Sequence, residues 1–365
     1  MSEWQTFCLK DLGKIVGGAT PPTNNPKNYG NKIAWITPKD LSTLQGRYIK
    51  KGSRSISRLG FKSCSCVLLP KHAILFSSRA PIGYVAIAKK RLCTNQGFKS
   101  IIPNKKIYFE FLYYLLKYHK DNISNIGGGT TFKEVSGATL GLFEVKIPPT
   151  YYEQQKIART LSVLDQKIEN NHKINELLHT LAYKIYEYYF KYKPKNAKLE
   201  QIIIENPKSS IMVKNAQKTQ DKYPFFTSGD NILSYPKAII DGRNCFLNTG
   251  GNAGIKFYVG KASYSTDTWC ICANEFSDYL YLLLSSIKNH INQSFFQGTS
   301  LKHLQKNLLK KYPIYMPSAH EIKKFNQIMM PLLTLISINT RTSKKLEQIR
   351  DFLLPLLLKQ QVKPK

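Results

Sequence analysis

Two heptad seams constrain this 365-residue chain more than any other feature of its sequence. The first is formed by residues separated alternately by four and three positions: Ile157, Leu161, Leu164, Ile168, Asn171, Asn175, Leu178, Ala182, Ile185 and Tyr189. The second follows the same alternation: Phe325, Met329, Leu332, Ile336, Asn339, Ser343, Leu346, Arg350, Leu353 and Leu357. A lone amphipathic helix drifts toward a period of about 3.6 residues, whereas a period of about 3.5 indicates a helix that packs along a partner helix. We therefore predict two long helices that pair with each other.

The two seams are copies of one pattern. Their offset is constant at 168 residues, because 325 − 157 and 339 − 171 give the same value. The polar interruption at Asn171 and Asn175 is copied at Asn339 and Ser343. Upstream of the helices, residues 127–149 align with residues 296–317 at an offset of 169, which pairs Gly129 with Gly298, Thr130 with Thr299, Lys133 with Lys302 and Pro148 with Pro317. The chain is therefore a tandem repeat.

The repeat predicts four segments: a first globular domain at 1–148, a first helix at 149–194, a second domain at 195–317 and a second helix at 318–365. The Pro- and Lys-containing string "KYKPKNAK" at 191–198 is typical of a domain boundary. Inside the domains, short apolar runs such as "HAILFSS" and "GIKFYVG" alternate with turn residues, which favours strands, and the clearest short helix is expected at 109–119. The predicted fold class is α+β, with two strand-rich domains joined and separated by two long helices.

The charge of the chain points to a polyanionic partner. Lys and Arg number 54 against 23 Asp and Glu, which gives a formal net charge of +31. An alternative explanation for part of this charge is an organism whose proteins are generally rich in lysine. No apolar run has the roughly 18 residues needed to span a membrane, and the N-terminus lacks the apolar region of a signal peptide. Seven dispersed cysteines fit a reducing compartment, so we expect a cytoplasmic protein without a membrane partner.

Motifs for catalysis and metal binding are absent from the sequence. Two C-x-C pairs, Cys64 with Cys66 and Cys270 with Cys272, lack histidines at zinc-site spacing, and we expect them to be small hydrophobic residues in strands. The chain has no phosphate-binding loop and no Gly-rich dinucleotide fingerprint. A Glu-x-Lys string at 144–146 has no matching upstream Asp, and no Asn- or Asp-Pro-Pro-aromatic loop for an amino-methyltransferase is present. We predict no catalytic residue and no metal site.

The same residues resemble a known family. The Gly-Thr turns, the two long seams, and the strings "ILFSSRAPIGYVAIA", "TNQGFKSI" and "STDTW" are similar to those of the specificity (S) subunit of type I restriction-modification enzymes. The resemblance covers nearly the whole chain. It departs from the family pattern at Pro331 and Pro355, which fall inside the second helix.

The resemblance implies a non-catalytic DNA reader. The two domains would be target-recognition domains, and the helices would form an antiparallel coiled coil that docks two methyltransferase (M) subunits for adenine methylation. Restriction/translocase (R) subunits would complete a complex that cuts unmethylated double-stranded DNA. The chain itself would bind no cofactor, whereas its partners would use S-adenosylmethionine, ATP and Mg. Helices of about 40 residues span roughly 60 Å, so we expect a bipartite, asymmetric site with an unread gap.

Polar seam residues typically fix helix register at a cost in stability. We therefore expect Asn171, Asn175, Asn339 and Ser343 to hold the two helices in one alignment. The alternative is a solvated notch without a specific role.

Base reading is expected from polar and basic loop residues of each domain. In the first domain the candidates are Thr37, Lys39, Ser78, Arg79, Asn95, Gln96, Thr130, Thr131 and Lys133. In the second they are Thr227, Ser228, Asn248, Asn252, Thr266, Asp267, Thr299, Ser300 and Lys302. No more than half should touch DNA, because Gly-Thr turns and Thr-Asn pairs commonly satisfy backbone groups instead.

Two other functions remain open at this point. A stand-alone nuclease or methyltransferase with divergent motifs would act on DNA as a purified chain. An RNA-binding protein would explain the charge, although it would not need the duplicated heptads.

Overall fold

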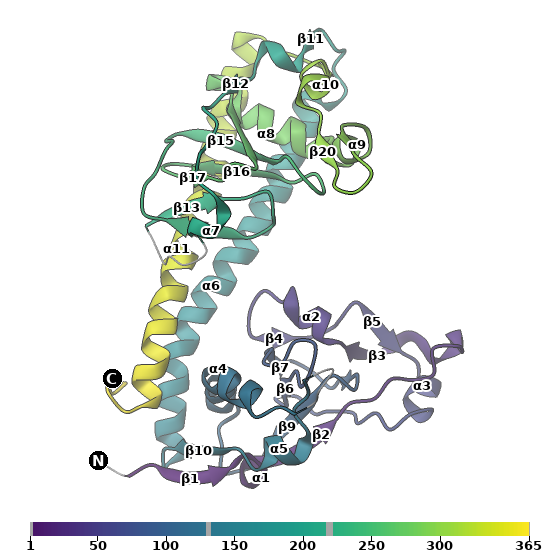
Figure 1. The fold of residues 1–365 in the computed structure, drawn as a ribbon, viewed down its shortest axis with the longest axis vertical. Helices are drawn as coiled ribbons and strands as arrows, with labels where there is room; N and C mark the ends of the chain where they lie inside the picture. Colours follow the sequence, from purple (N-terminus) through teal and green to yellow (C-terminus); the bar gives the residue numbers. More distant parts are fainter. Residues whose placement is uncertain (1–2, 129–132, 217–221, 365) are drawn as a thin grey trace. The chain divides into compact units, whose positions relative to one another are not determined.

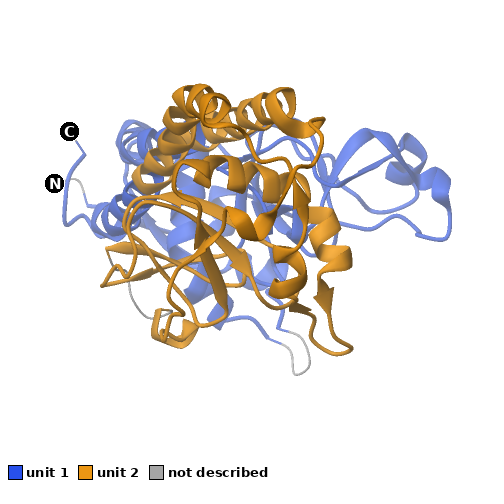
Figure 2. Ribbon diagram, turned by 90° about the horizontal axis from the view of Figure 1, so that it is seen from above, with its two compact units in different colours: residues 1–170, 343–365 blue, residues 171–342 orange. Residues whose placement is uncertain are grey.

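The computed structural model describes residues 3–128, 133–216 and 222–364. The chain divides into two compact units, unit 1 with Met1–Asn170 and Ser343–Lys365 and unit 2 with Asn171–Thr342 (Figure 2). Two long helices, α6 (Tyr151–Tyr186) and α11 (Ala319–Leu358), each contribute one part to either unit (Figure 1). Because the units divide both helices, the four-segment boundaries drawn from the sequence stay a prediction.

The helices pair in antiparallel fashion. In unit 1 the beginning of α6 and the end of α11 share one hydrophobic core, which includes Leu161 and Leu357. In unit 2 the end of α6 and the beginning of α11 share another, which includes Ala182 and Phe325. The start of each helix thus meets the end of the other, as predicted. A π-helical turn, η2 (Glu187–Lys191), follows α6.

The described residues of unit 1 form three sheets. The largest consists, in spatial order, of β2 (Gly13–Gly17), β9 (Lys99–Pro103), β6 (Ile74–Phe76), β7 (Val85–Ala88) and β4 (Tyr48–Ile49). A three-stranded sheet consists of β5 (Arg54–Ile56), β3 (Tyr29–Ile36) and β8 (Cys93–Thr94). A two-stranded sheet pairs β1 (Gln5–Cys8) with β10 (Glu144–Ile147).

Unit 2 repeats most of this topology, although its described residues contain no strand that corresponds to β4. Its largest sheet consists, in spatial order, of β12 (Ile204–Glu205), β18 (Thr268–Cys272), β15 (Arg243–Asn248) and β16 (Ile255–Val259). Its three-stranded sheet consists of β14 (Ile232–Tyr235), β13 (Tyr223–Phe226) and β17 (Ser263–Tyr264). One of its two-stranded sheets pairs β11 (Ala197–Lys198) with β21 (Pro313–Ile314), and the other pairs β19 (Phe296–Gln297) with β20 (His303–Leu304). Both three-stranded sheets contain one parallel pair, β3 with β8 and β13 with β17. The fold class predicted from the sequence, a duplicated α+β domain with an antiparallel helix pair, is confirmed.

The central strand β6 is apolar throughout because both of its faces are covered. In β6, Ile74 and Phe76 belong to the core shared with α4 (Phe109–Asn125), whereas Leu75 belongs to the core on the other face. The helix predicted at 109–119 is thus present and longer than expected. In unit 2, α8 (Ser277–Ser286) takes the corresponding place against β15 and β16.

The remaining elements are short. They are α1 (Leu9–Leu12), η1 (Pro26–Asn28), α2 (Pro38–Ser42), α3 (Arg58–Lys62), α5 (Gly137–Gly141), η3 (Leu199–Gln201), α7 (Val213–Ala216), η4 (Asn274–Phe276), α9 (Lys288–Ser294), β19 (Phe296–Gln297), β20 (His303–Leu304) and α10 (Lys306–Lys310). Cys270 and Cys272 lie in β18 as expected. The expectation was wrong for Cys64 and Cys66, which lie in the loop after α3, where the Cys66 thiol donates to the Ala19 carbonyl at 3.0 Å.

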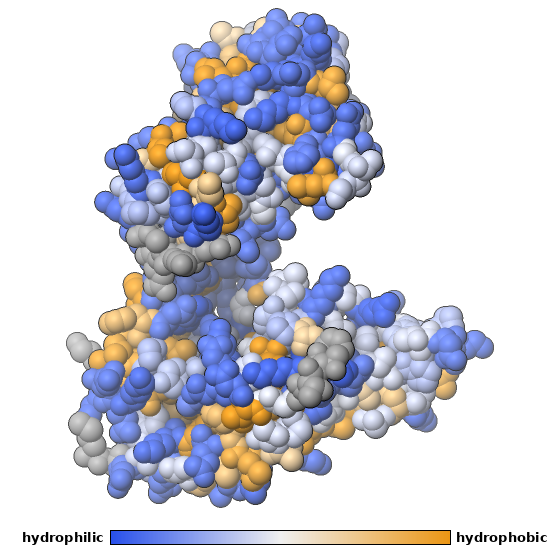
Figure 3. Space-filling model, in the orientation of Figure 1, coloured by the Kyte–Doolittle hydropathy of each residue, from blue (hydrophilic) through white to orange (hydrophobic). Residues whose placement is uncertain are grey.

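The face seen in Figure 3 is mainly hydrophilic, with smaller hydrophobic patches in each unit. Within residues 3–128, 133–216 and 222–364, no helix is both long and apolar enough to cross a membrane.

Candidate nucleic-acid interface

Three backbone hydrogen bonds gather the candidate loops of unit 1 at one edge. The amide of Ser78, just after β6, donates to the Gly97 carbonyl at 2.8 Å. The amide of Asn95, just after β8, donates to Ile36 at the end of β3 at 2.9 Å. The amide of Val135 donates back to the Ser78 carbonyl at 3.0 Å. Residues from four separate stretches of the chain therefore meet where the strands end.

The same three bonds recur in unit 2. The Thr249 amide donates to Asp267 at 3.4 Å, the Ser265 amide to Phe226 at 2.9 Å, and the Leu304 amide to Thr249 at 2.9 Å. The structure thus brings the loops that carry the candidates of each domain to equivalent positions, although the side chains differ between the two domains.

Several candidates in unit 1 support the loops themselves. Thr37 caps α2, and its amide and its hydroxyl each donate to the Asp40 carboxylate at 2.8 Å. The Asn95 side chain accepts the Gly97 amide at 3.0 Å. Ser78 is fully buried, and its hydroxyl finds no hydrogen-bond partner in the described part of the chain. These three side chains are therefore less suited to base reading than their sequence pattern suggested.

The accessible candidates of unit 1 are basic or amide side chains. Lys39, Gln96 and Lys133 are exposed, and Arg79 is partly exposed. The Gln96 side chain accepts a hydrogen bond from the Thr20 hydroxyl. Thr130 and Thr131 lie outside the described residues.

The candidates of unit 2 divide in the same way. Thr227 and Asn248 are buried, and Ser228 and Thr266 are partly buried. The exposed candidates are Asn252, Asp267, Thr299, Ser300 and Lys302. The Ser228 hydroxyl donates to the Asp267 carbonyl, so this side chain ties two loops together.

Sequence reasoning missed Lys256, which supports the buried candidates of unit 2. Its amine donates to the Thr227 carbonyl at 2.8 Å and to the Asn248 side-chain oxygen at 2.9 Å. Burial lowers the pKa of Lys256 to about 8; Lys288 lowers it further, and Asp230 opposes the shift. The signal was available as a lone lysine inside the apolar run "GIKFYVG", but the contacts that it makes come from two other loops.

Sequence reasoning also missed Glu134, an acidic residue on a strongly basic chain. Its carboxylate lies 3.2 Å from the Lys99 amine and 3.7 Å from the Arg79 guanidinium. Its pairing with two cations could not be read from the sequence, because Arg79 and Lys99 lie 55 and 35 residues upstream.

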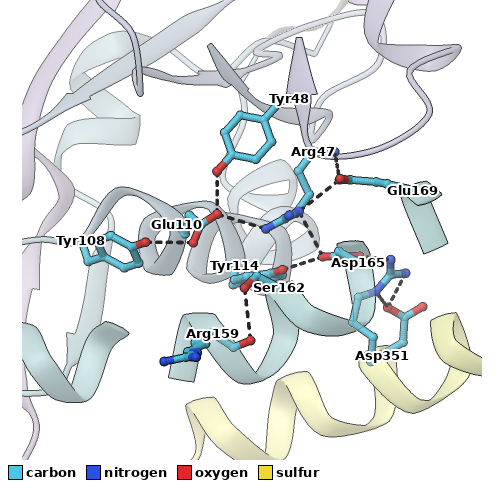
Figure 4. Close-up of polar contacts among 11 residues, drawn as sticks. Arg47, Tyr48, Tyr108, Glu110, Tyr114, Arg159, Ser162, Asp165, Glu169 and Asp351 are labelled. Atoms are coloured by element: carbon cyan, nitrogen blue, oxygen red, sulfur yellow. Dashed lines mark hydrogen bonds and ion pairs between the residues drawn. The ribbon is translucent and has the colours of Figure 1, made fainter. Parts of the chain in front are cut away.

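A buried ionic network attaches the recognition domain of unit 1 to the helix pair. Figure 4 shows Arg47 between Glu110 on α4 and Glu169 on α6. The Arg47 guanidinium lies 3.1 Å from each carboxylate, and its side chain is only 3% exposed. The Tyr48 hydroxyl donates to Glu110 at 2.5 Å. A buried charge needs such partners, because an unpaired one would be costly to desolvate.

The network continues through Asp165 of α6 to α11. Asp165 accepts hydrogen bonds from the Tyr114 hydroxyl at 2.5 Å and from the Arg350 guanidinium at 2.7 Å. Burial, reinforced by the charge of Asp165, raises the pKa of Tyr114 and keeps it a hydrogen-bond donor. One set of contacts therefore joins α4, α6 and α11 to the loop before β4.

Unit 2 has its own version of this attachment. Arg243 of β15 binds Asp278 of α8 with two hydrogen bonds, of 2.5 and 2.6 Å, and its third nitrogen donates to Thr334 of α11 at 2.9 Å. Burial raises the pKa of the Asp278 carboxyl, although the hydrogen bonds from Arg243 oppose the shift. In both units an arginine joins the domain's main helix to the helix pair.

Two asparagines meet across the helix pair in unit 2. The Asn339 side chain donates to the Asn175 side-chain oxygen at 2.9 Å. The Asn175 amide donates to the Ile336 carbonyl and to the Thr340 hydroxyl, both at 3.3 Å. Asn171 and Ser343 are each 3% exposed. That these four residues fix the register stays a prediction.

In each unit one flank of the helix pair is apolar and exposed. On both helices these residues come one position before a seam residue, and in an antiparallel pair such positions lie on the same side of the seam. They include Val163, Ile174, Leu177, Leu181, Ile328, Leu335, Ile338, Ile349 and Phe352. In each unit the domain contacts buried residues of α6: the Tyr114 hydroxyl donates to Asp165 in unit 1, and Tyr279 packs against Tyr186 in unit 2.

Comparison with known proteins assigns the family. The family model described as "Type I restriction modification DNA specificity domain" matches residues 1–180 and 195–348. The type I restriction enzyme MjaIX specificity subunit of Methanocaldococcus jannaschii is 33% identical over 403 residues, which covers 98% of this chain and 93% of that relative. The type I restriction enzyme HindI specificity subunit of Haemophilus influenzae is 31% identical over 177 residues, 46% of this chain and 37% of the relative.

A solved structure shares the fold. The crystal structure of a type I restriction-modification system S subunit from M. genitalium aligns with a TM-score of 0.65 at 18% identity, over 97% of this chain and 96% of that chain. Two family matches, one per repeat, agree with the duplicated topology. The chain belongs to the family of type I restriction-modification specificity subunits.

Proposed function

We propose that this specificity subunit reads a bipartite, asymmetric DNA site with its two sets of loops, one half-site per domain. The observation that carries the proposal is the recurrence of the same three backbone hydrogen bonds in both domains, around unlike side chains. Equivalent positions with different contents suit two readers of different sequences. The net charge of +31 supplies the attraction to phosphate.

The family assignment makes the chain the DNA-recognition subunit of a complex with M and R subunits, and not its catalytic part. We place the M subunits on the exposed apolar flank of the helix pair, because large apolar side chains at such exposure favour burial by a partner. S-adenosylmethionine, ATP and Mg are proposed to bind the partner subunits only. The cytoplasm is the proposed location.

A binding experiment tests this function. The full chain with its M subunits is mixed with randomised duplex DNA, and the bound fraction is sequenced. We expect two short, different sequences at a fixed separation, and duplex DNA should outcompete structured RNA. Preference for RNA would contradict the proposal, as would cleavage or methylation of DNA by the purified chain alone.

A further inference from the structure

Glu134 occupies an unusual place for a carboxylate. It lies at the edge where the candidate loops of unit 1 meet, one residue before Val135, whose amide holds the Ser78 carbonyl. Its side chain is 36% exposed and is flanked by Lys99 at 3.2 Å and Arg79 at 3.7 Å. A hollow of about 610 Å³ opens beside it, lined also by Arg79, Lys133 and Ser124. The carboxylate is thus held in place and still accessible.

The repeat gives Glu134 a counterpart with different chemistry. The offset of 169 that pairs Lys133 with Lys302 also pairs Glu134 with His303. The backbone agrees, because Glu134 exchanges hydrogen bonds with Gly128 at 2.9 and 3.1 Å, and His303 pairs with Gln297 in the corresponding hairpin. The neighbouring lysine is kept in both copies, whereas this position changes from a carboxylate to an imidazole. A conserved phosphate contact beside a variable base contact would produce this pattern.

An ionised carboxylate accepts hydrogen bonds and donates none. Next to DNA a carboxylate is repelled by the phosphates, so its favourable partner is an amino group of a base. In the major groove, Glu and Asp typically accept a hydrogen bond from the N4 amino group of cytosine. Arg79 and Lys99 offset the repulsion and fix the direction of the carboxylate. We propose that Glu134 is a specificity-determining residue that accepts a hydrogen bond from a cytosine amino group in the half-site of unit 1. This inference rests on the proposed DNA-reading function.

The variant Glu134→Gln tests the inference, because it keeps the shape of the side chain and adds a donor. Glutamine pairs with adenine through N6 and N7. In the randomised-DNA selection with the full chain and its M subunits, we expect one position of one half-site to change from cytosine to adenine. Affinity for the original site should fall about tenfold or more. The melting temperature should not change.

The matched control is His303→Gln, which should alter the other half-site only. Two results would overturn the inference. In one, Glu134→Gln leaves both half-sites unchanged. In the other, it tightens binding to all sequences equally, which would mean that Glu134 only withholds Arg79 and Lys99 from DNA. If the wild-type chain selects no sequence at all, the proposed function itself fails, and this outcome is distinct from both.

Discussion

Arg47 shows how a single side chain determines where a recognition domain is held. It lies in a loop of the domain, yet its partners are on α4 and α6, 63 and 122 residues further along the chain. At 3% exposure the guanidinium has lost most of its hydration, so the carboxylates must replace it. Arg243 does the same in unit 2 with Asp278 and Thr334.

Replacing Arg47 by methionine should strongly destabilise unit 1. The change keeps an apolar stem but removes the shared cation of Glu110 and Glu169, whose side chains are only 12% and 17% exposed. Removing one partner of a buried ion pair costs about 3–5 kcal/mol. Urea unfolding measures this loss, and Arg91→Met at an exposed site should cost less than about 0.5 kcal/mol. Equal effects of the two variants would show that the network does not hold the domain.

We expect Lys256 to make the stability of unit 2 depend on pH in alkaline solution. Its pKa is about 8 in the folded chain and 10.5 ordinarily, so between these values unfolding takes up a proton. Raising the pH therefore disfavours unfolding in this window. The free energy of unfolding of the wild type, minus that of Lys256→Met, should rise from pH 8 to pH 10.5. A flat difference across that window would show that Lys256 titrates normally.

The sequence correctly predicted that the candidate residues lie in loops. It was a poorer guide to which of their side chains are free to contact DNA. Polar residues after apolar runs were expected to lie in loops, and they do, because strands end where the apolar pattern ends. Whether a side chain is free depends on partners from distant segments. Asn248 is occupied by Lys256 and by the Asn252 carbonyl, and neither contact leaves a local pattern.

At the scale of elements, the helix pair depends on its polar positions as well as on its apolar ones. Asn175 and Asn339 bond to each other across the seam of unit 2, which an antiparallel alignment requires. The bond links the middle of the seam of α6 to that of α11. A shifted alignment would leave both amides without this partner.

A double-mutant cycle tests the pairing of these asparagines. Either Asn175→Leu or Asn339→Leu leaves an unpaired amide in the seam and should destabilise the chain by about 1–3 kcal/mol. The double variant should recover most of the loss, which gives a coupling of about 1 kcal/mol or more. The exposed Asn170→Leu serves as a control and should show no coupling with Asn339→Leu. Strict additivity for the first pair would contradict the observed contact.

A substitution on the exposed apolar flank should weaken binding of the M subunit without unfolding the chain. Leu177 is 71% exposed, so Leu177→Asp should change the melting temperature little. It should weaken M-subunit binding about tenfold or more, because a charge would be buried at the contact. Titration calorimetry measures the affinity. The control Leu142→Asp, at a 59% exposed site between α5 and β10, should bind normally.

The long helices could be predicted because a heptad pattern is local and repeats for many turns. The order of the strands in the sheets could not be predicted from such a local pattern. Strands such as β8 have two residues, and β8 pairs with β3 more than 50 residues upstream. The duplication nevertheless extends from the seams to the sheets, because four strands of the largest sheet and all three strands of the three-stranded sheet follow the same order in both units.

For the whole molecule, duplication followed by divergence explains both what is shared and what differs. The strand orders, the helix pair and the arginine attachments are shared, and they determine how each recognition domain is held. The loop side chains differ, as at Glu134 and His303. One chain can thus present two unlike readers on a common support, and each should recognise its own half-site.

Sequencing of methylated bases tests this account most directly. Genomic DNA is compared between cells that carry the complete system and cells that lack only this chain. The account predicts a methylated adenine in a motif of two unlike halves at a fixed spacing, and the loss of every such mark with the chain. A contiguous or symmetric motif, or marks that persist without the chain, would contradict it.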